Sequence, residues 1–225
     1  MIFDADFLIS LLTIIAIDIV LGGDNAIVIA LASRNLPEKQ RNKAIVLGTG
    51  LAVVVRVFLT AVTVYLLQIP YLLFIGGILL FFIAYNLLVE DDKGENIKGE
   101  TTLFSAVKTI VFADIAMGLD NVLAIAGASH GNLLLVLIGL LVSIPIIIWG
   151  SKMILLLMEQ FSFLIYIGAG ILAYTASSMI VEEEQFLRIF EYDPLLKYGV
   201  QAAIISAVLL AGWMTKRLKS NRVHL

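Results

Sequence analysis

The chain of 225 residues contains no cysteine, and only 15% of its residues are charged. The absence of cysteine excludes disulfides, zinc–thiolate sites and iron–sulfur clusters. A net charge of −3 leaves no basic surface of the kind that nucleic-acid binding requires. The chain also lacks the His-Glu-x-x-His, Gly-x-Ser-x-Gly and phosphate-loop motifs. We therefore expect that the protein is not an enzyme.

Apolar sequence makes up most of the chain. Hydrophobic residues account for 60% of it and the mean hydropathy is +1.01, which indicates a polytopic membrane protein. Because about 20 apolar residues cross a bilayer as a helix, the sequence predicts an all-α fold. Residues 1–225 should form a single membrane domain. Seven transmembrane helices are expected near residues 7–32, 44–67, 71–89, 103–128, 133–158, 163–181 and 198–215.

Basic residues predict the orientation of these helices. The connection 33–43 contains four Lys and Arg residues, and the tail after residue 215 contains four more. The connections 68–70 and 129–132 contain none. Since Lys and Arg accumulate in cytoplasmic loops, we expect the N-terminus outside and the C-terminus in the cytoplasm.

An acidic motif occurs twice. Residues 18–25 read Asp-Ile-Val-Leu-Gly-Gly-Asp-Asn, and residues 114–121 read Asp-Ile-Ala-Met-Gly-Leu-Asp-Asn. We predict two three-helix repeats, residues 1–92 and 101–184, followed by an outer loop, a seventh helix and a basic tail in residues 185–225. Three spans per unit would turn the second repeat upside down relative to the first. Many secondary transporters have this plan, with the substrate site near the membrane midplane.

Each motif places two carboxylates inside the membrane, where charge is costly and usually functional. Carboxylate and amide oxygens suit hard divalent ions such as Mg²⁺, Ca²⁺ or Mn²⁺. Met117 could add a thioether that favours Mn²⁺, although methionine more often simply packs. The acidic runs at 90–92 and 182–184 are interpreted as hydrated helix ends. The predicted metal ligands are Asp18, Asp24, Asn25, Asp114, Asp120 and Asn121.

Other residues near the motifs could support a metal site. Glycine tolerates unusual dihedrals, so Gly22, Gly23 and Gly118 mark expected helix breaks between the paired carboxylates. Four aspartates exceed the charge of one divalent ion, and Arg56 and Lys152 are candidate counter-charges. A structural ion pair remains the alternative for Arg56, and extension to the membrane surface is the alternative for Lys152. Proton uptake when the ion leaves would make proton exchange natural.

The motifs carry a family resemblance. Residues 18–29, 32–37 and 114–121 resemble the TerC family of integral membrane proteins, within the LysE-type transporter superfamily. The short bacillus-type branch, which lacks added cytoplasmic domains, is the most similar. The resemblance implies a metal exporter of the bacterial cell membrane that favours manganese and supplies metal to exported enzymes. Gly23 is replaced by Leu119 in the second motif, so the two copies need not bind metal equally.

The sequence therefore predicts export of Mn²⁺ from the cytoplasm, with protons as the exchanged ion. One alternative is a membrane accessory protein that binds Mn²⁺ and delivers it to secreted enzymes, the secretion machinery or another partner. A second alternative is an exporter of amino acids or other small solutes. Four membrane aspartates favour a cation over an amino acid, because they would repel its carboxylate.

Overall fold

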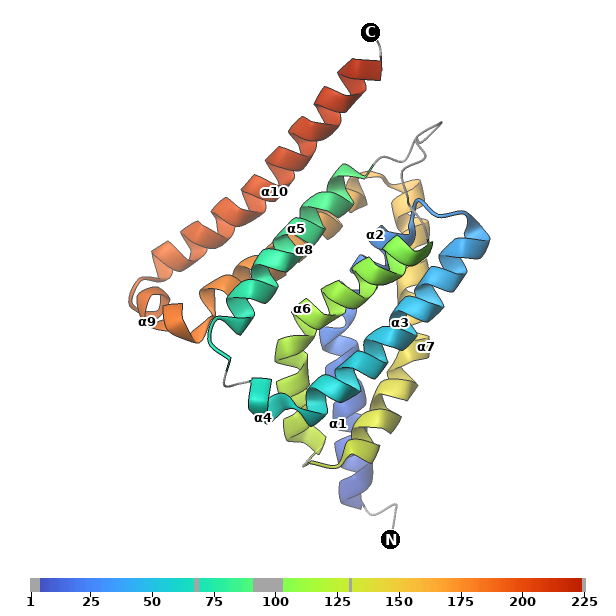
Figure 1. The fold of residues 1–225 in the computed structure, drawn as a ribbon, viewed down its shortest axis with the longest axis vertical. Coiled ribbons are helices and arrows are strands. Elements are labelled where there is room, and N and C mark those ends of the chain that lie inside the picture. The colour runs from blue at the N-terminus through green and yellow to red at the C-terminus, as the bar shows by residue number, and fades with distance from the viewer. Residues whose placement is uncertain (1–4, 67–68, 91–102, 130, 224–225) are drawn as a thin grey trace.

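A computed structural model describes residues 5–66, 69–90, 103–129 and 131–223, shown in Figure 1. Within these ranges the chain forms helices and short connections without a strand, so the all-α prediction is confirmed. The side chains outside the description within these ranges are those of residues 5, 6, 64, 119, 120, 123 and 219–223.

Each predicted span coincides with a helix. The first span is divided into α1 and α2, and the second ends in the single turn α4. The short helix α9 lies in the predicted outer loop and was not expected. The helices are α1 (Ala5–Leu21), α2 (Gly23–Ser33), α3 (Glu38–Ala61), α4 (Thr63–Leu66), α5 (Leu72–Val89), α6 (Leu103–Ser129), α7 (Leu133–Gln160), α8 (Phe163–Val181), α9 (Glu184–Tyr192) and α10 (Pro194–Val223).

The helices are those of a multi-pass membrane protein. Among the described residues, α3, α5, α7, α8 and α10 are long and apolar enough to cross a membrane, and the bent pair α1–α2 raises the number to six. Large apolar side chains such as Val20, Phe58 and Phe104 point outward, where lipid rather than water would cover them. The remaining predicted span coincides with α6, which includes side chains outside the description. Seven spans therefore stay a prediction.

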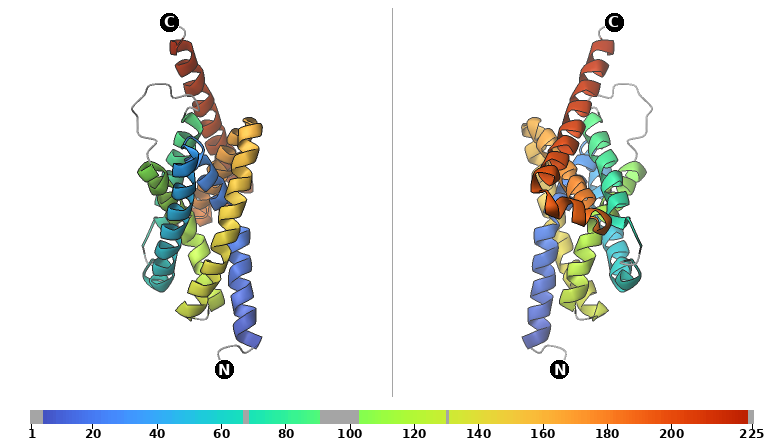
Figure 2. Two further views of the ribbon diagram at one scale, coloured as in Figure 1. Left: turned by 90° about the vertical axis from the view of Figure 1, so that its right-hand side faces the viewer. Right: turned by 90° about the vertical axis from the view of Figure 1, so that its left-hand side faces the viewer.

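The middle and third helices of each predicted repeat pack against helices of the other repeat. The middle helix α3 packs on α6, the middle helix α7 packs on α1 and α2, and the third helices α5 and α8 pack on each other. Figures 1 and 2 show the two termini at opposite ends, with α1, α5 and α7 running toward the C-terminal end and α3, α6 and α8 running back. A pair of units related by two-fold symmetry would pair in this way, but the inverted repeat itself stays a prediction.

Two apolar clusters flank the centre of the bundle. One joins α2, α5, α6 and α8 together with the end of α7 and part of α10, and the other joins α1, α3, α6 and α7. Ile14, Val53 and Leu140 belong to the second cluster, and each lies three or four residues before a polar residue of the site described below. Burial of these side chains fixes the four helices that meet at the site.

Within the run 182–184, Glu182 and Glu184 are exposed as expected, but the interpretation as hydrated is wrong for Glu183. Its side chain is buried, and its Oε1 and Oε2 accept hydrogen bonds from the backbone N–H groups of Tyr71 and Phe74, both at 3.2 Å. These donors lie at the start of α5, where backbone N–H groups lack partners within the helix. Tyr71 adopts the left-handed region with φ of 62°. The start of α9 therefore caps α5.

Candidate cation site

The first motif lies at a bend between two helices. α1 ends at Leu21 and α2 begins at Gly23, and the two axes differ by 49°. A Cβ atom on Gly22 would lie 2.4 Å from the backbone oxygen of Asp18, so this position accommodates only glycine. A Cβ atom on Gly23 would meet nothing within 4 Å. The predicted helix break in the first copy is therefore confirmed, with Gly22 as the residue that permits it.

The predicted break at Gly118 is wrong, because α6 continues without interruption from Leu103 to Ser129. The second motif has Leu119 where the first has Gly23, and leucine favours a helix far more than glycine does. A Cβ atom on Gly118 would lie 4.0 Å from both Nε of Arg56 and Oδ2 of Asp114. Gly118 thus leaves space beside the arginine instead of breaking the helix.

Arg56 joins the two motifs at the centre of the bundle. Its Nη1 donates to Oδ1 of Asp18, and its Nη2 donates to Oδ1 of Asp114. The hydroxyl of Ser143 donates to Oδ2 of Asp18. These side chains come from α1, α3, α6 and α7, and all four are buried. The first aspartate of each motif therefore contacts the same buried cation, the guanidinium of Arg56.

The charges of this cluster do not balance. Asp18 and Asp114 contribute two negative charges when ionised, and Arg56 contributes one positive charge. Nε of Arg56 is also buried without a hydrogen-bond partner. A buried unbalanced charge is costly, because low-dielectric surroundings screen it poorly. The cluster therefore has the electrostatics of a site that accepts one more positive charge.

A cavity of about 20 Å³ adjoins the arginine. This volume is sufficient for about one water molecule or one ion. Asn25, Thr49 and Met117 line it together with Arg56 and Asp114. Both amide atoms of Asn25 and the hydroxyl of Thr49 are buried without a hydrogen-bond partner. Buried polar groups are normally satisfied, so these unpaired oxygens are candidate ligands for a bound ion or water.

The remaining predicted ligands are Asp24, Asp120 and Asn121. Asp24 is half-buried in the first turn of α2, where its Oδ1 accepts a hydrogen bond of 3.0 Å from the backbone N–H of Asn25. Asn121 is buried on α6. The side chain of Asp120 lies outside the described residues. Among the side chains that are described, no three His, Cys, Asp or Glu residues form a group that could hold a metal ion. The structure thus brings together Asp18 and Asp114 of the four aspartates.

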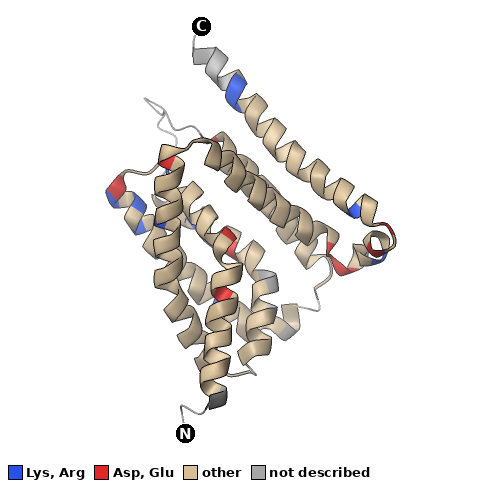
Figure 3. Cartoon of the chain, turned by 180° about the vertical axis from the view of Figure 1, so that it is seen from behind, with Lys and Arg blue, Asp and Glu red and all other residues tan. Residues whose placement is uncertain are grey.

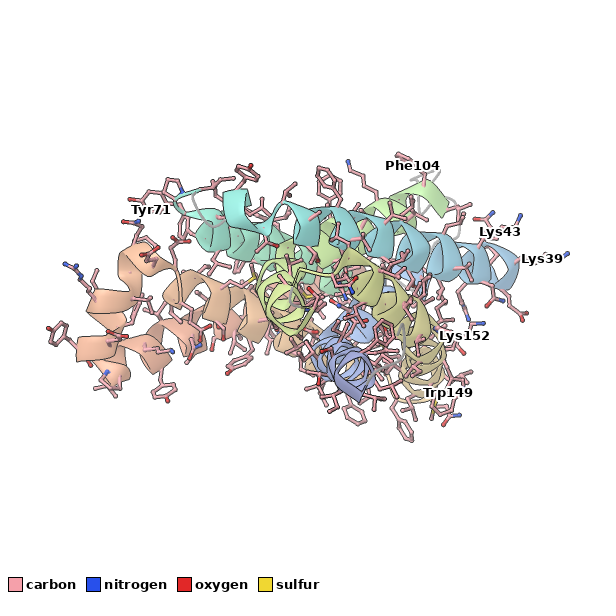
Figure 4. All side chains as sticks on the ribbon, turned by 90° about the horizontal axis from the view of Figure 1, so that it is seen from below. Lys39, Lys43, Tyr71, Phe104, Trp149 and Lys152 are labelled. Atoms are coloured by element: carbon pink, nitrogen blue, oxygen red, sulfur yellow. The ribbon has the colours of Figure 1, made fainter. Side chains whose placement is uncertain are left out.

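Lys152 does not contribute to the cluster. It is exposed on α7, and Figure 4 shows its side chain projecting away from the bundle, as do Lys39 and Lys43. Figure 3 shows that most charged residues lie toward helix ends and connections, with few inside the bundle. The interpretation of Lys152 as a counter-charge is therefore wrong, because its long side chain extends to the surface. The alternative of an extension toward the membrane surface fits its position.

Sequence reasoning missed two polar residues of the site. Ser143 is the only hydroxyl residue in the apolar run 133–150, and this isolation was a usable signal. Thr49 precedes Arg56 by two helical turns and lies on the same face of α3. At the 96-residue spacing of the two motifs, Thr49 corresponds to Pro145 and Ser143 to Leu47, so a comparison of the predicted repeats could not identify them.

Comparisons with known proteins agree with the motifs. The family described as "Integral membrane protein TerC family" matches residues 3–220. The uncharacterized membrane protein YjbE of Bacillus subtilis is 56% identical over 180 residues, which cover 80% of this chain and 83% of YjbE. The uncharacterized membrane protein YkoY of the same organism is 27% identical over 90% of this chain and 70% of its own length.

The chain also matches part of a longer protein. It is 29% identical to the UPF0053 inner membrane protein YoaE of Escherichia coli over 72% of this chain, which corresponds to 37% of YoaE. No solved structure matches the chain. The family match covers nearly the whole sequence, including both acidic motifs. The chain is therefore a member of the TerC family of integral membrane proteins.

Proposed function

We propose that this protein transports a divalent cation across the membrane, with Mn²⁺ as its preferred ion and export from the cytoplasm as its direction. One observation supports the proposal above all others. Asp18 and Asp114, from two matching motifs, converge on a buried guanidinium at the centre of the bundle. Two membrane carboxylates that hold one cation between them are electrostatically suited to exchange it for another.

The surrounding atoms match the preferences of a hard divalent ion. The carboxylate of Asp114 and the amide oxygen of Asn25 line the cavity and provide oxygen ligands, and the carboxylate of Asp18 contacts the same guanidinium. Met117 is buried, and it lines the same cavity. Its thioether is the feature that favours Mn²⁺ over Mg²⁺ and Ca²⁺, because a softer ligand suits a transition metal better. Asp24, Asp120 and Asn121 would then serve as ligands along the path rather than at this centre.

Proton exchange follows from the charge balance. Without a metal, Arg56 neutralises only one of the two carboxylates it contacts, so a proton on the other would make the empty site neutral. The proposed cycle therefore carries metal in one direction and protons in the other. The direction of export comes from the family resemblance, since a site built from two similar halves does not define a direction.

The cavity size favours an ion over an organic solute. A volume of about 20 Å³ has no room for an amino acid, so an exporter of small solutes would have to open this site much further than a metal exporter would. An accessory protein that binds Mn²⁺ and passes it to a secreted enzyme would use the same ligands. Flux across a membrane, and not binding, separates this alternative from a transporter.

The decisive experiment measures Mn²⁺ flux into vesicles that contain the purified full-length protein. Asp114→Asn removes one charge without changing the size of the side chain, and we expect it to abolish flux. The matched control is Glu191→Gln, which makes the same chemical change at an exposed position on α9 and should leave flux intact. A pH-sensitive dye inside the vesicles would report the proton countercurrent.

Each outcome of the vesicle experiment has a distinct meaning. Binding of Mn²⁺ without flux in the parent protein would contradict the transporter and leave the accessory protein. Equal flux in the parent and in Asp114→Asn would contradict the proposed site. Flux of Mn²⁺ without proton movement would contradict the exchange but not the transport.

A further inference from the structure

Arg56 occupies the position that a metal bound by both motifs would need. Its two terminal nitrogens each engage one oxygen, Oδ1 of Asp18 and Oδ1 of Asp114. We propose that Arg56 is a tethered competing cation, which holds the empty site closed and which a metal ion must displace in order to bind. The inference rests on the proposed function and adds the residue that sets the affinity and the charge selectivity of the site.

Metal and guanidinium cannot both lie between these carboxylates. An ion that coordinates both aspartates would come within contact distance of the planar guanidinium, and two cations repel each other strongly in a medium of low dielectric. Arginine remains charged at every pH that a cell experiences, so deprotonation does not relieve the repulsion. Binding at this point therefore requires movement of the arginine side chain.

The surroundings of Arg56 permit that movement. The guanidinium is held by its two terminal nitrogens, while Nε has no hydrogen-bond partner. Gly118 places no side chain against Nε, and the cavity of about 20 Å³ adjoins the arginine on the face of Asn25 and Thr49. The unpaired hydroxyl oxygen of Thr49 is available as an acceptor for a displaced N–H group, while the amide oxygen of Asn25 stays a candidate metal ligand.

Charge then decides which cations displace Arg56. With arginine in place, the two carboxylates and the guanidinium sum to one negative charge. A monovalent ion is attracted to the two carboxylates no more strongly than the singly charged guanidinium is, so nothing would offset the two lost charge-assisted hydrogen bonds. A divalent ion neutralises both carboxylates. The competitor therefore selects divalent over monovalent cations, although Na⁺ and K⁺ are far more abundant in cells.

Binding of Mn²⁺ to the purified full-length protein, measured by calorimetry, tests this inference. Arg56→Gln removes the competitor, and we expect Mn²⁺ to bind at least about tenfold more tightly, because about tenfold is the worth of one of the two charge-assisted hydrogen bonds that no longer compete. Arg56→Lys retains one charge but cannot bridge both carboxylates, so it should fold and give an intermediate affinity. The matched control is Lys39→Gln, which removes an exposed positive charge from the same helix and should bind like the parent.

A second measurement separates competition from a structural role. Each protein is titrated with Mn²⁺ in sodium chloride and in choline chloride of equal ionic strength. Sodium should weaken Mn²⁺ binding to Arg56→Gln, because the open site admits monovalent ions, and should leave the parent unchanged. If both Arg56 variants bound Mn²⁺ as the parent does or more weakly, the role of Arg56 as a competing cation would be refuted, and the proposed transport function would stand. A parent protein whose Mn²⁺ binding is absent, or is unaffected by Asp114→Asn, would overturn both.

Discussion

The bend in the first motif depends on the missing side chain of Gly22, and Gly22→Ala tests this dependence. The new Cβ atom would lie 2.4 Å from the backbone oxygen of Asp18 and 3.3 Å from Cδ1 of Ile147. The first of these atoms belongs to the backbone of α1, so only a shift of the helix end can relieve the contact. Overpacking of this kind typically lowers the free energy of unfolding by about 1–3 kcal/mol.

Gly23→Ala is the matched control, because it makes the same change one residue further along. A Cβ atom on Gly23 meets nothing within 4 Å. Gly23 is the first residue of α2, where alanine favours the helix more than glycine does. We therefore expect the stability of Gly23→Ala to equal that of the parent or to exceed it by less than about 1 kcal/mol.

Resistance to heating in detergent is the appropriate assay, since unfolding of such proteins is often irreversible. The fraction that remains monodisperse after heating is measured by size-exclusion chromatography for the parent and both variants. Mn²⁺ flux in vesicles is measured in parallel, because a shift of α1 also moves Asp18. We expect Gly22→Ala to lose both heat resistance and flux. A heat resistance of Gly22→Ala equal to that of the parent, or an equal loss in Gly23→Ala, would refute the role of the bend.

Three further substitutions test the contacts of the bundle. Asp18→Asn breaks a buried ion pair, so it should lower the free energy of unfolding by about 3–5 kcal/mol in the heating assay and abolish Mn²⁺ flux in vesicles. Unchanged stability and flux would contradict the buried pair with Arg56. Ser143→Ala removes a hydrogen bond to a carboxylate and should cost about 1.5–3 kcal/mol by the same heating assay, whereas no loss would mean that the hydroxyl is dispensable. Glu183→Gln leaves one acceptor fewer for the first turn of α5, so hydrogen exchange should accelerate at the amides of Tyr71 and Phe74 while flux is retained; loss of flux would instead link this cap to transport.

The helices could be predicted from the sequence because their cause is local. A run of apolar residues must satisfy its backbone hydrogen bonds within itself when it lies in lipid, and only a helix does this over a single segment. The predicted span 133–158 thus corresponds to α7, Leu133–Gln160. The bend at Gly22 was also local, since it depends on the missing side chain of one residue. The close approach of Gly118 to Arg56 could not be predicted in this way, because Arg56 belongs to another helix.

The sequence by itself determined which residues carry charge into the membrane, and it identified the two motifs and Arg56. Only the tertiary structure decided that Arg56 lies between Asp18 and Asp114, that Ser143 supports this cluster and that Lys152 points away from it. The physical reason is that an ion pair joins side chains from separate helices. Its geometry follows from how α1, α3, α6 and α7 pack, and local sequence does not encode that packing.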